Sequence, residues 1–196
     1  MQIPIQEAIQ QSIEAKQRMQ DDQSLLQALE TVTMQCIEVF RNGGKVLFCG
    51  NGGSAADAQH LAAEFSGRFY FDRPPLYAEA LHVNTSYLTA VGNDYGFDAI
   101  YARMVEAAGR PGDLLFAMST SGNSANVLLA AEKAKAIGLH VVAMTGHSGG
   151  KLRELADFWL NAPSEDTPRI QECHMLMGHT ICQLVEAALF TRPHTS

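Results

Sequence analysis

The chain has 196 residues, of which 46% are hydrophobic, so it is long enough for one domain with a sizeable core and too apolar for general disorder. A formal net charge of -7 argues against a nucleic-acid or anionic-membrane surface, so neither partner is expected. No apolar run reaches the ~18 residues that span a bilayer, the first residues lack signal-peptide features and the four cysteines form no CxxC pair, which together indicate a soluble protein of the reducing cytoplasm.

Two helices are expected at the start of the chain. Residues of about 5–20 and 24–42 carry apolar side chains at every third or fourth position, and the turn Asn42-Gly43-Gly44 ends the second helix. These helices, like a long one expected over about 168–190, exceed what a parallel sheet needs for cover. We therefore expect them to be available for packing against partner subunits.

Short apolar runs, typical of strands buried on both faces, then alternate with helical patterns. The expected strands lie at 45–49, 78–83, 114–118, 140–145 and 158–160. The helices between and after them are expected at about 54–67, 97–108, 124–137, 149–156 and 168–190. Alternation of strand and helix predicts an α/β fold whose parallel sheet is covered by helices on both faces.

Two polar loops follow the first and third expected strands. Residues 50–54 and 119–124 combine glycines with hydroxyl groups, and each loop leads into the N-terminus of a helix. Ligands of open parallel sheets bind at the carboxyl ends of the strands, where free N–H groups and the helix dipole favour anions. We predict that the loop 119–124 binds a phosphate with neutral donors; a solvated turn with a good helix cap is the alternative.

Two other kinds of glycine-rich site fit the same loops less well. A P-loop requires a Gly-Lys-Ser/Thr sequence, and neither loop contains a lysine. The spacing of Gly50, Gly52 and Ala55 matches the loose dinucleotide fingerprint, but the acidic residue expected ~20 positions later should end a second strand. Asp72 instead falls in a polar stretch, and a dinucleotide site leaves the second loop without a role.

Histidine, carboxylate and amide side chains recur at helical spacing on two expected helices. His60 and Glu64 lie four residues apart and therefore point the same way. Gln171 and His179 lie eight residues apart on the last helix, about 80° apart around its axis, with His174 near the same face. Such a donor set suits zinc or a similar divalent ion. A surface pair at His60 and Glu64, and a core histidine at 179, are the alternatives.

Another polar pair stands between apolar segments. Asn93 and Asp94 occupy the glycine-flanked sequence VGNDYGF, where they favour either ligand binding or an Asx turn.

Motifs over residues of about 45–190 resemble the sugar isomerase (SIS) domain family, in particular its members that act on sedoheptulose 7-phosphate. The matching segments, in the same order, are CGNGGSAADAQHLAAEFSGRF, RPPLYAEAL, AVGNDYGF, GDLLFAMSTSGNSANV, TGHSGGKLRELAD and DTPRIQECHMLMGHTICQLVE. The resemblance implies a three-layer α/β/α sandwich with a five-stranded parallel sheet, extra N- and C-terminal helices and a homotetramer whose sites are shared between subunits. It also implies one SIS domain over 1–196, with helices 1–43 used in packing and oligomerisation and a sugar-phosphate-binding core over 44–192.

The activity implied by the resemblance is an aldose–ketose isomerisation. D-Sedoheptulose 7-phosphate would be converted to D-glycero-D-manno-heptose 7-phosphate through an enediolate. This reaction is the first step towards activated heptose for lipopolysaccharide core or other surface glycans. Such chemistry needs a base near carbon, an acid near the carbonyl oxygen and stabilisation of the developing oxyanion.

The resemblance also implies roles for individual residues. Phosphate binding falls on Ser119, Thr120, Ser121 and Ser124. Sugar contacts fall on Asn51, Gly52, Gly53, Glu64, Asn93, Asp94 and Gln171. One zinc ion per subunit would be held by His60, Glu64, Gln171 and His179. We expect Glu64 to be the catalytic base and His179 the catalytic acid.

A second branch of the same family offers a different function. Its members bind the bacterial replication initiator DnaA, share the fold and the tetramer, and resemble this chain in RPPL and IQECHML. The full ligand set separates the two hypotheses, because this chain contains GNGGS, Glu64 and His179 together. We therefore prefer the isomerase.

Overall fold

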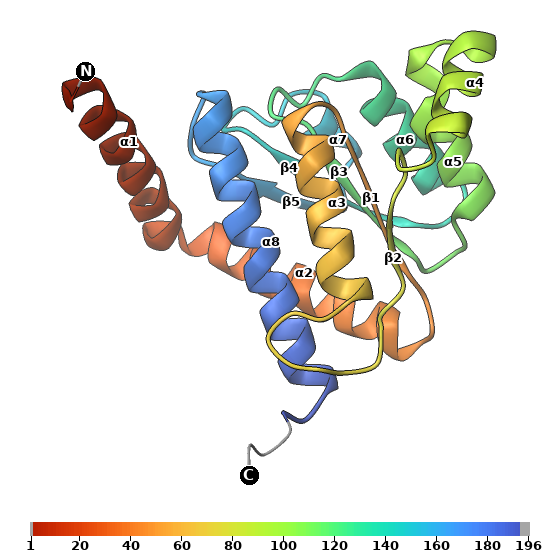
Figure 1. Cartoon of the computed structure of the whole chain (residues 1–196), viewed down its shortest axis with the longest axis horizontal. Coiled ribbons are helices and arrows are strands. Elements are labelled where there is room, and N and C mark those ends of the chain that lie inside the picture. Colours follow the sequence, from red (N-terminus) through yellow and green to blue (C-terminus); the bar gives the residue numbers. More distant parts are fainter. Residues whose placement is uncertain (1, 193–196) are drawn as a thin grey trace.

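Five parallel strands form the centre of the molecule (Figure 1). The computed structural model describes residues 2–192 of the chain. The strands are β1 (Val46–Gly50), β2 (Ala78–Ala80), β3 (Leu114–Met118), β4 (His140–Thr145) and β5 (Phe158–Asn161). Their order in the sheet is β2-β1-β3-β4-β5, and all four pairings are parallel. The α/β class and the five-stranded parallel sheet expected from the sequence are confirmed.

Helices cover both faces of the sheet, which completes the three-layer sandwich (Figure 1). One face carries α2 (Gln23–Arg41), α3 (Gly53–Ser66) and α8 (Thr167–Leu189), with α1 (Gln2–Asp21) beside α8. The other face carries α4 (Thr85–Tyr95), η1 (Phe97–Ala99), α5 (Ile100–Ala108), α6 (Ala125–Ala136) and α7 (Leu152–Leu155). Successive strand residues serve opposite layers: Phe48 packs with the α3 and α8 side, and Leu47 and Cys49 pack with the α5 and α6 side.

One helix was not expected from the sequence. Residues 85–95 form α4, and β2 ends at Ala80 rather than continuing to position 83. The side chain of Asn84 caps the helix by accepting a hydrogen bond of 3.0 Å from the backbone N–H of Tyr87. This segment has polar residues at its start and a single buried residue, Val91, so its apolar periodicity is weak. Asn93 and Asp94 therefore lie in the last turn of a helix rather than in a loop.

Helices α3 and α8 approach each other closely at a glycine and are tied together at one end by a buried ion pair. A Cβ atom on Gly178 would lie only 2.5 Å from the Leu61 side chain, so the glycine permits the close approach. Arg73 and Glu186, 2% and 1% exposed, form a salt bridge of 3.1 Å. Arg73 also donates hydrogen bonds to the carbonyl oxygens of Glu64 and Phe65, and so caps the C-terminus of α3.

Among the described residues, no helix combines the length with the apolar character that crossing a membrane requires.

Candidate active site

The two polar loops identified in the sequence lie side by side at the carboxyl edge of the sheet. β1 and β3 are neighbours, with Gly50 opposite Met118 at their ends. β1 lies between β2 and β3, so the sheet extends in opposite directions from this point, and the crevice at such a switch is where open parallel sheets bind ligands. The sheet order therefore brings together two segments that are about seventy residues apart in the chain.

The loop after β3 is a closed, hydrogen-bonded turn. The hydroxyl groups of Ser119 and Ser124 lie 2.9 Å apart, and Ser119 is only 4% exposed. Asn123 donates to the carbonyl oxygen of Ser121 at 2.9 Å and accepts from the backbone N–H of Lys151 at 3.1 Å. The loop enters α6, where the first N–H groups have no partner within the helix, so an anion can accept from them.

The loop after β1 turns sharply into α3. Gly52 has a φ of +56°, in the region that favours glycine, and it precedes the first helical residue, Gly53. A Cβ atom on Gly53 would collide with the amide group of Gln171. The absence of a side chain at position 53 thus lets Gln171 of α8 lie directly against the start of α3.

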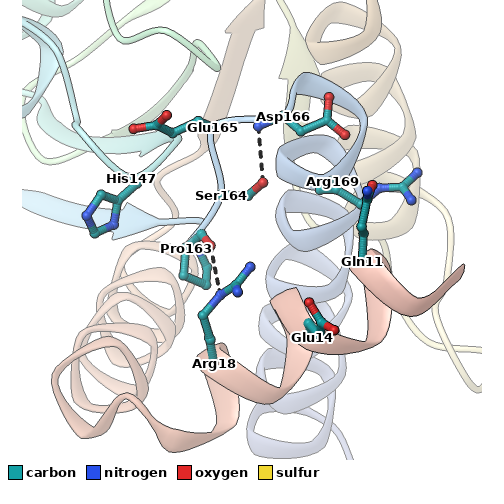
Figure 2. A pocket seen from close by; sticks show the side chains of 9 residues that line it. All are labelled: Gln11, Glu14, Arg18, His147, Pro163, Ser164, Glu165, Asp166 and Arg169. Carbon is teal, nitrogen blue, oxygen red and sulfur yellow. Dashed lines mark hydrogen bonds between the residues drawn. The ribbon is translucent and has the colours of Figure 1, made fainter. Parts of the chain in front are cut away.

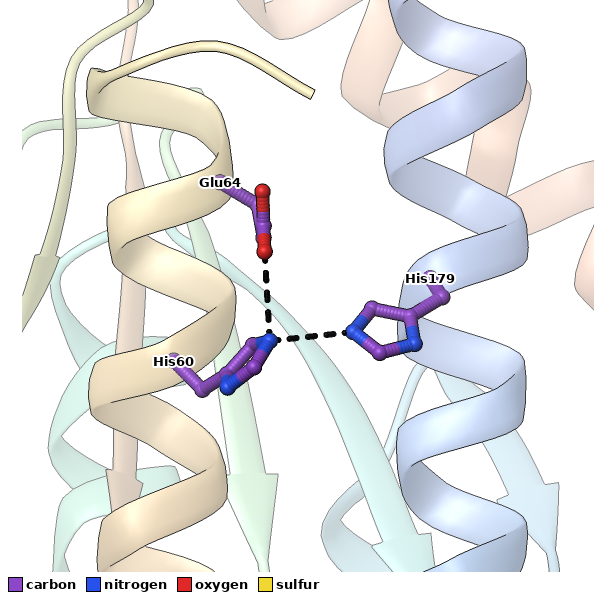
Figure 3. Close-up of side chains that lie close together, drawn as sticks. All are labelled: His60, Glu64 and His179. Atoms are coloured by element: carbon purple, nitrogen blue, oxygen red, sulfur yellow. Dashed lines mark hydrogen bonds and ion pairs between the residues drawn. The ribbon is translucent and has the colours of Figure 1, made fainter. Parts of the chain in front are cut away.

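Three of the predicted metal ligands converge between α3 and α8 (Figure 3). The Nε2 atom of His60 lies 3.1 Å from Glu64 Oε1 and 3.1 Å from Nε2 of His179. All three ligand atoms lie within 4.8 Å of one another. One proton on His60 Nε2 cannot bond both neighbours at once, whereas a cation among the three atoms would be a partner for each of them. The three residues therefore form a group that could hold a metal ion.

Gln171 and His179 line the same hollow, which also contains a residue that the sequence analysis missed. This hollow, of about 610 Å³, lies along α8 and includes Asp57 of α3. The Oδ2 atom of Asp57 is buried without a hydrogen-bond partner. Burial raises the pKa of Asp57 to about 6, against a smaller lowering effect of His60. Its position three residues before His60 was the available signal, because that spacing puts both side chains on one face of α3.

Two other candidates lie elsewhere. His174 is fully buried and turns away from His179, since its Nε2 atom lies 3.1 Å from the carbonyl oxygen of Thr145. Asn93 and Asp94 are exposed at the end of α4, where the Asn93 amide donates to the Asp94 carboxylate at 2.8 Å. Neither residue of this pair contacts the His60 group in the structure described.

A second, larger hollow contains none of the predicted site residues (Figure 2). It measures about 760 Å³ and lies between α1 and the segments that precede α7 and α8. Acidic and basic side chains are mixed along it, and Arg18 donates across it to the carbonyl oxygen of Pro163 at 3.2 Å. Its chemistry favours no particular anion or cation.

Comparison with known proteins assigns the family. The SIS domain family matches residues 8–146. The chain is 55% identical over 185 residues to the phosphoheptose isomerase of Mycobacterium tuberculosis, covering 94% of each chain. The structure matches phosphoheptose isomerases from Neisseria gonorrhoeae (TM-score 0.89, 43% identity, 95% of this chain and 98% of that one) and Francisella tularensis (TM-score 0.90, 38% identity, 94% and 97%). The chain belongs to the SIS domain family and, within it, to the phosphoheptose isomerases.

Proposed function

We propose that this protein is a phosphoheptose isomerase that converts D-sedoheptulose 7-phosphate to D-glycero-D-manno-heptose 7-phosphate. The observation that carries the proposal is the convergence of His60, Glu64 and His179 between α3 and α8, the two helices that Gln171 joins at the loop after β1 by lying against Gly53. Isomerisation of a sugar phosphate requires an acid–base group of this kind and an anion-binding loop. The reaction takes place in the cytoplasm and supplies heptose for activated sugars of surface glycans.

Substrate binding divides between the two loops. The phosphate is held by the loop after β3, through Ser119, Thr120, Ser121 and Ser124. The sugar is contacted by the loop after β1 and by neighbouring side chains, namely Asn51, Gly52, Gly53, Glu64, Asn93, Asp94 and Gln171. Hydroxyl and backbone donors suit a phosphate without a lysine or arginine, because the start of α6 adds the helix dipole.

In the chemical step, Glu64 removes a proton from C1 of the open-chain ketose and returns it to C2. His179 protonates the oxygen on C2 as C1 loses its proton, and it takes the proton from the oxygen on C1 as C2 is protonated and the aldehyde forms, so that both side chains regain their starting states. The two side chains come from different helices, and each lies 3.1 Å from Nε2 of His60, so one bound sugar can contact both.

The donor set fits zinc, with His60, Glu64, Gln171 and His179 as ligands. Two imidazoles and a carboxylate whose ligand atoms lie within 4.8 Å of one another match the preferences of this ion, and Gln171 lines the same hollow as His179. A bound zinc ion would polarise the carbonyl and hydroxyl oxygens of the sugar. Its presence would also weaken Glu64 as a base, so that Glu64 either binds loosely or leaves the proton transfer to another residue.

The protein acts as a homotetramer of single SIS domains, with residues 1–43 in packing and assembly and residues 44–192 as the sugar-phosphate-binding core. Four isoleucines of α1 support this assignment, because they are 54–76% exposed: Ile3, Ile5, Ile9 and Ile13. Figure 1 shows α1 leaning away from the sheet layers. Light scattering coupled to size-exclusion chromatography tests the assembly.

The experiment is turnover of sedoheptulose 7-phosphate by purified protein as isolated, after chelation and after zinc is restored. Turnover that chelation abolishes and zinc restores supports both the isomerase and the four ligands. Turnover that is unaffected by chelation supports the isomerase activity and indicates that Glu64 and His179 act as an acid–base pair without a metal. Absence of turnover in every state rejects the proposal, and binding of DnaA is then the next measurement.

A further inference from the structure

The two polar loops are joined by a reciprocal pair of side-chain amides. The Asn51 amide nitrogen donates to Asn126 Oδ1 at 2.8 Å, and the Asn126 amide nitrogen donates to Asn51 Oδ1 at 2.9 Å. Asn51 follows β1, and Asn126 lies in the first turn of α6, directly after the phosphate loop. The pair therefore connects the two ligand-binding segments across the switch in the sheet.

The Asn126 residue of this pair is buried. It is 2% exposed, and an amide buried to that degree costs free energy unless its polar atoms are bonded. The bonds to Asn51 supply that partner in both directions. Asn126 was not among the residues expected to act at the site, because a single asparagine in the first turn of a helix carries no sequence signal of its own.

The loop after β1 has a backbone hydrogen bond of its own, from the N–H of Ser54 to the carbonyl oxygen of Asn51 at 3.0 Å, and is also anchored from outside. Gly52 precedes α3 and provides no side-chain cap for the helix. It is a glycine with a positive φ, so it also brings no side chain that could pack and stabilise the turn. The Tyr101 hydroxyl donates to the carbonyl oxygen of Gly50, on one side of the turn. The Asn51–Asn126 pair fixes the next residue on the other side, so consecutive residues are held from two elements.

We propose that Asn126 is a positioning residue that sets the distance between the phosphate loop and the sugar-binding loop. The proposal rests on the function proposed above. The Asn51 side chain is then occupied mainly by Asn126, and the segment 51–53 reaches the sugar with its backbone. In this role the Asn126 side chain touches neither the reacting carbons nor the phosphate; its effect passes through Asn51.

This role predicts different effects on the two ends of the substrate. Loss of the pair leaves the phosphate loop with its own Ser119–Ser124 contact but frees the sugar-binding loop. In Asn126→Leu we expect kcat/KM for the heptose phosphate to fall by about 10²-fold, as for a misplaced reacting group. We expect inhibition by inorganic phosphate to stay unchanged, since its binding needs only the phosphate loop.

Asn126→Asp provides the sharper test. A protonated carboxylic acid can donate to Asn51 Oδ1 and accept from its amide nitrogen, so both hydrogen bonds are restored. An ionised carboxylate faces Asn51 Oδ1 with an acceptor and loses one of them. Activity relative to the wild type should therefore rise as the pH falls towards the range where the aspartate protonates, whereas Asn126→Leu should stay low at every pH.

The matched control is Asn123→Asp, which places the same charge three residues earlier, in the phosphate loop and outside the amide pair. Equal pH profiles for the two aspartate variants would overturn the proposal, because charge near the phosphate would then explain both. Unchanged kcat/KM in Asn126→Leu would also overturn it, and so would an equal loss of phosphate binding.

A readout without turnover separates this proposal from the proposed function. Backbone hydrogen exchange at residues 50–53 should be faster in Asn126→Leu than in the wild type, and restored in Asn126→Asp at low pH. If the wild type turns over no heptose phosphate, the proposed function fails. Faster exchange in Asn126→Leu would still support the amide clamp, that is, the positioning of residues 50–53 by the Asn51–Asn126 pair. Unchanged exchange in both variants overturns the clamp whatever the activity.

Discussion

Two polar regions of the α3–α8 pair differ in how their polar groups are satisfied. At the satisfied end, which follows the C-terminus of α3, Arg73 and Glu186 are almost completely buried and each makes several hydrogen bonds. Along the ligand region of α3, from Asp57 to Glu64, one buried oxygen of Asp57 has no partner, and the ligand atoms of Glu64 and His179 both lie near that of His60. The His60 side chain is also 50% exposed. The satisfied end can hold the two helices in register while the ligand region keeps bonding capacity for a ligand.

Physical reasons support this division. Burial alone would raise the pKa of Glu186, but the N–H groups of Phe69 and Tyr70 and the Arg73 guanidinium together lower it below its ordinary value. Glu186 is therefore ionised at neutral pH and binds Arg73 as a full charge. A buried pair of this kind gains little over apolar residues but is costly to break. Its value lies in fixing where the end of α3, with Glu64, lies relative to α8.

The largest expected effect is in the ligand region. Glu64→Gln keeps the shape of the side chain but removes the base, so we expect kcat to fall by about 10²- to 10⁴-fold. Thermal unfolding should be nearly unchanged, because Glu64 is only partly buried. Steady-state kinetics with sedoheptulose 7-phosphate measures the effect. Turnover close to that of the wild type would exclude Glu64 as the base.

At the satisfied end, Glu186→Gln should act on stability. It leaves Arg73 charged and buried without its counter-ion, so we expect the free energy of unfolding to fall by about 3–5 kcal/mol. Urea denaturation at neutral pH measures the loss, with Glu30→Gln on the exposed side of α2 as control. A loss similar to that of the control would mean that the ion pair does not hold α3 on α8.

Elsewhere on α8, His174 should make stability depend on pH. Burial lowers the pKa of His174 from 6.5 to about 4, against a smaller raising effect of its bond to Thr145. The unfolded chain then takes up a proton that the folded chain resists, so stability is full above about pH 6.5 and declines by about 3 kcal/mol as the pH falls towards 4. His174→Gln should flatten this decline. Identical pH profiles of denaturation for the variant and the wild type would contradict the assignment.

The smallest effect concerns Asp57. Its raised pKa means that the folded protein loses stability as the pH rises from about 4 to about 6 and the carboxylate becomes charged. Asp57→Asn should therefore stabilise the metal-free protein at neutral pH by about 1 kcal/mol, after allowance for solvent screening. Thermal denaturation at pH 5 and pH 8 tests the sign. Destabilisation at pH 8 would show that the charged form has a partner.

Part of this organisation could be predicted from the sequence. Strands with continuous apolar runs, such as Leu114–Met118, coincide with the expected range because burial on both faces leaves a simple pattern. Helical spacing brought His60 and Glu64 to one face, and their meeting with His179 is a tertiary fact that the family resemblance, not the spacing, anticipated. α4 was missed because a polar cap and a weak apolar stripe look like a loop. The Asn51–Asn126 pair depends on the order of strands, which local patterns do not encode.

The contact between the phosphate loop and the segment before α7 has an evolutionary consequence. Gly122 has a φ of +66°, and a Cβ atom there would collide with the carbonyl oxygen of Gly149. A Cβ atom on Gly150 would in turn lie 2.5 Å from the carbonyl oxygen of Ser121. The backbone of each loop thus leaves no room for a side chain at the facing glycine of the other. A larger residue at either glycine therefore requires the other loop to move. A larger residue at the glycine of the phosphate loop therefore has to evolve together with a change in the segment before α7. Single substitutions at this contact are expected to be a poor route to a new ligand preference.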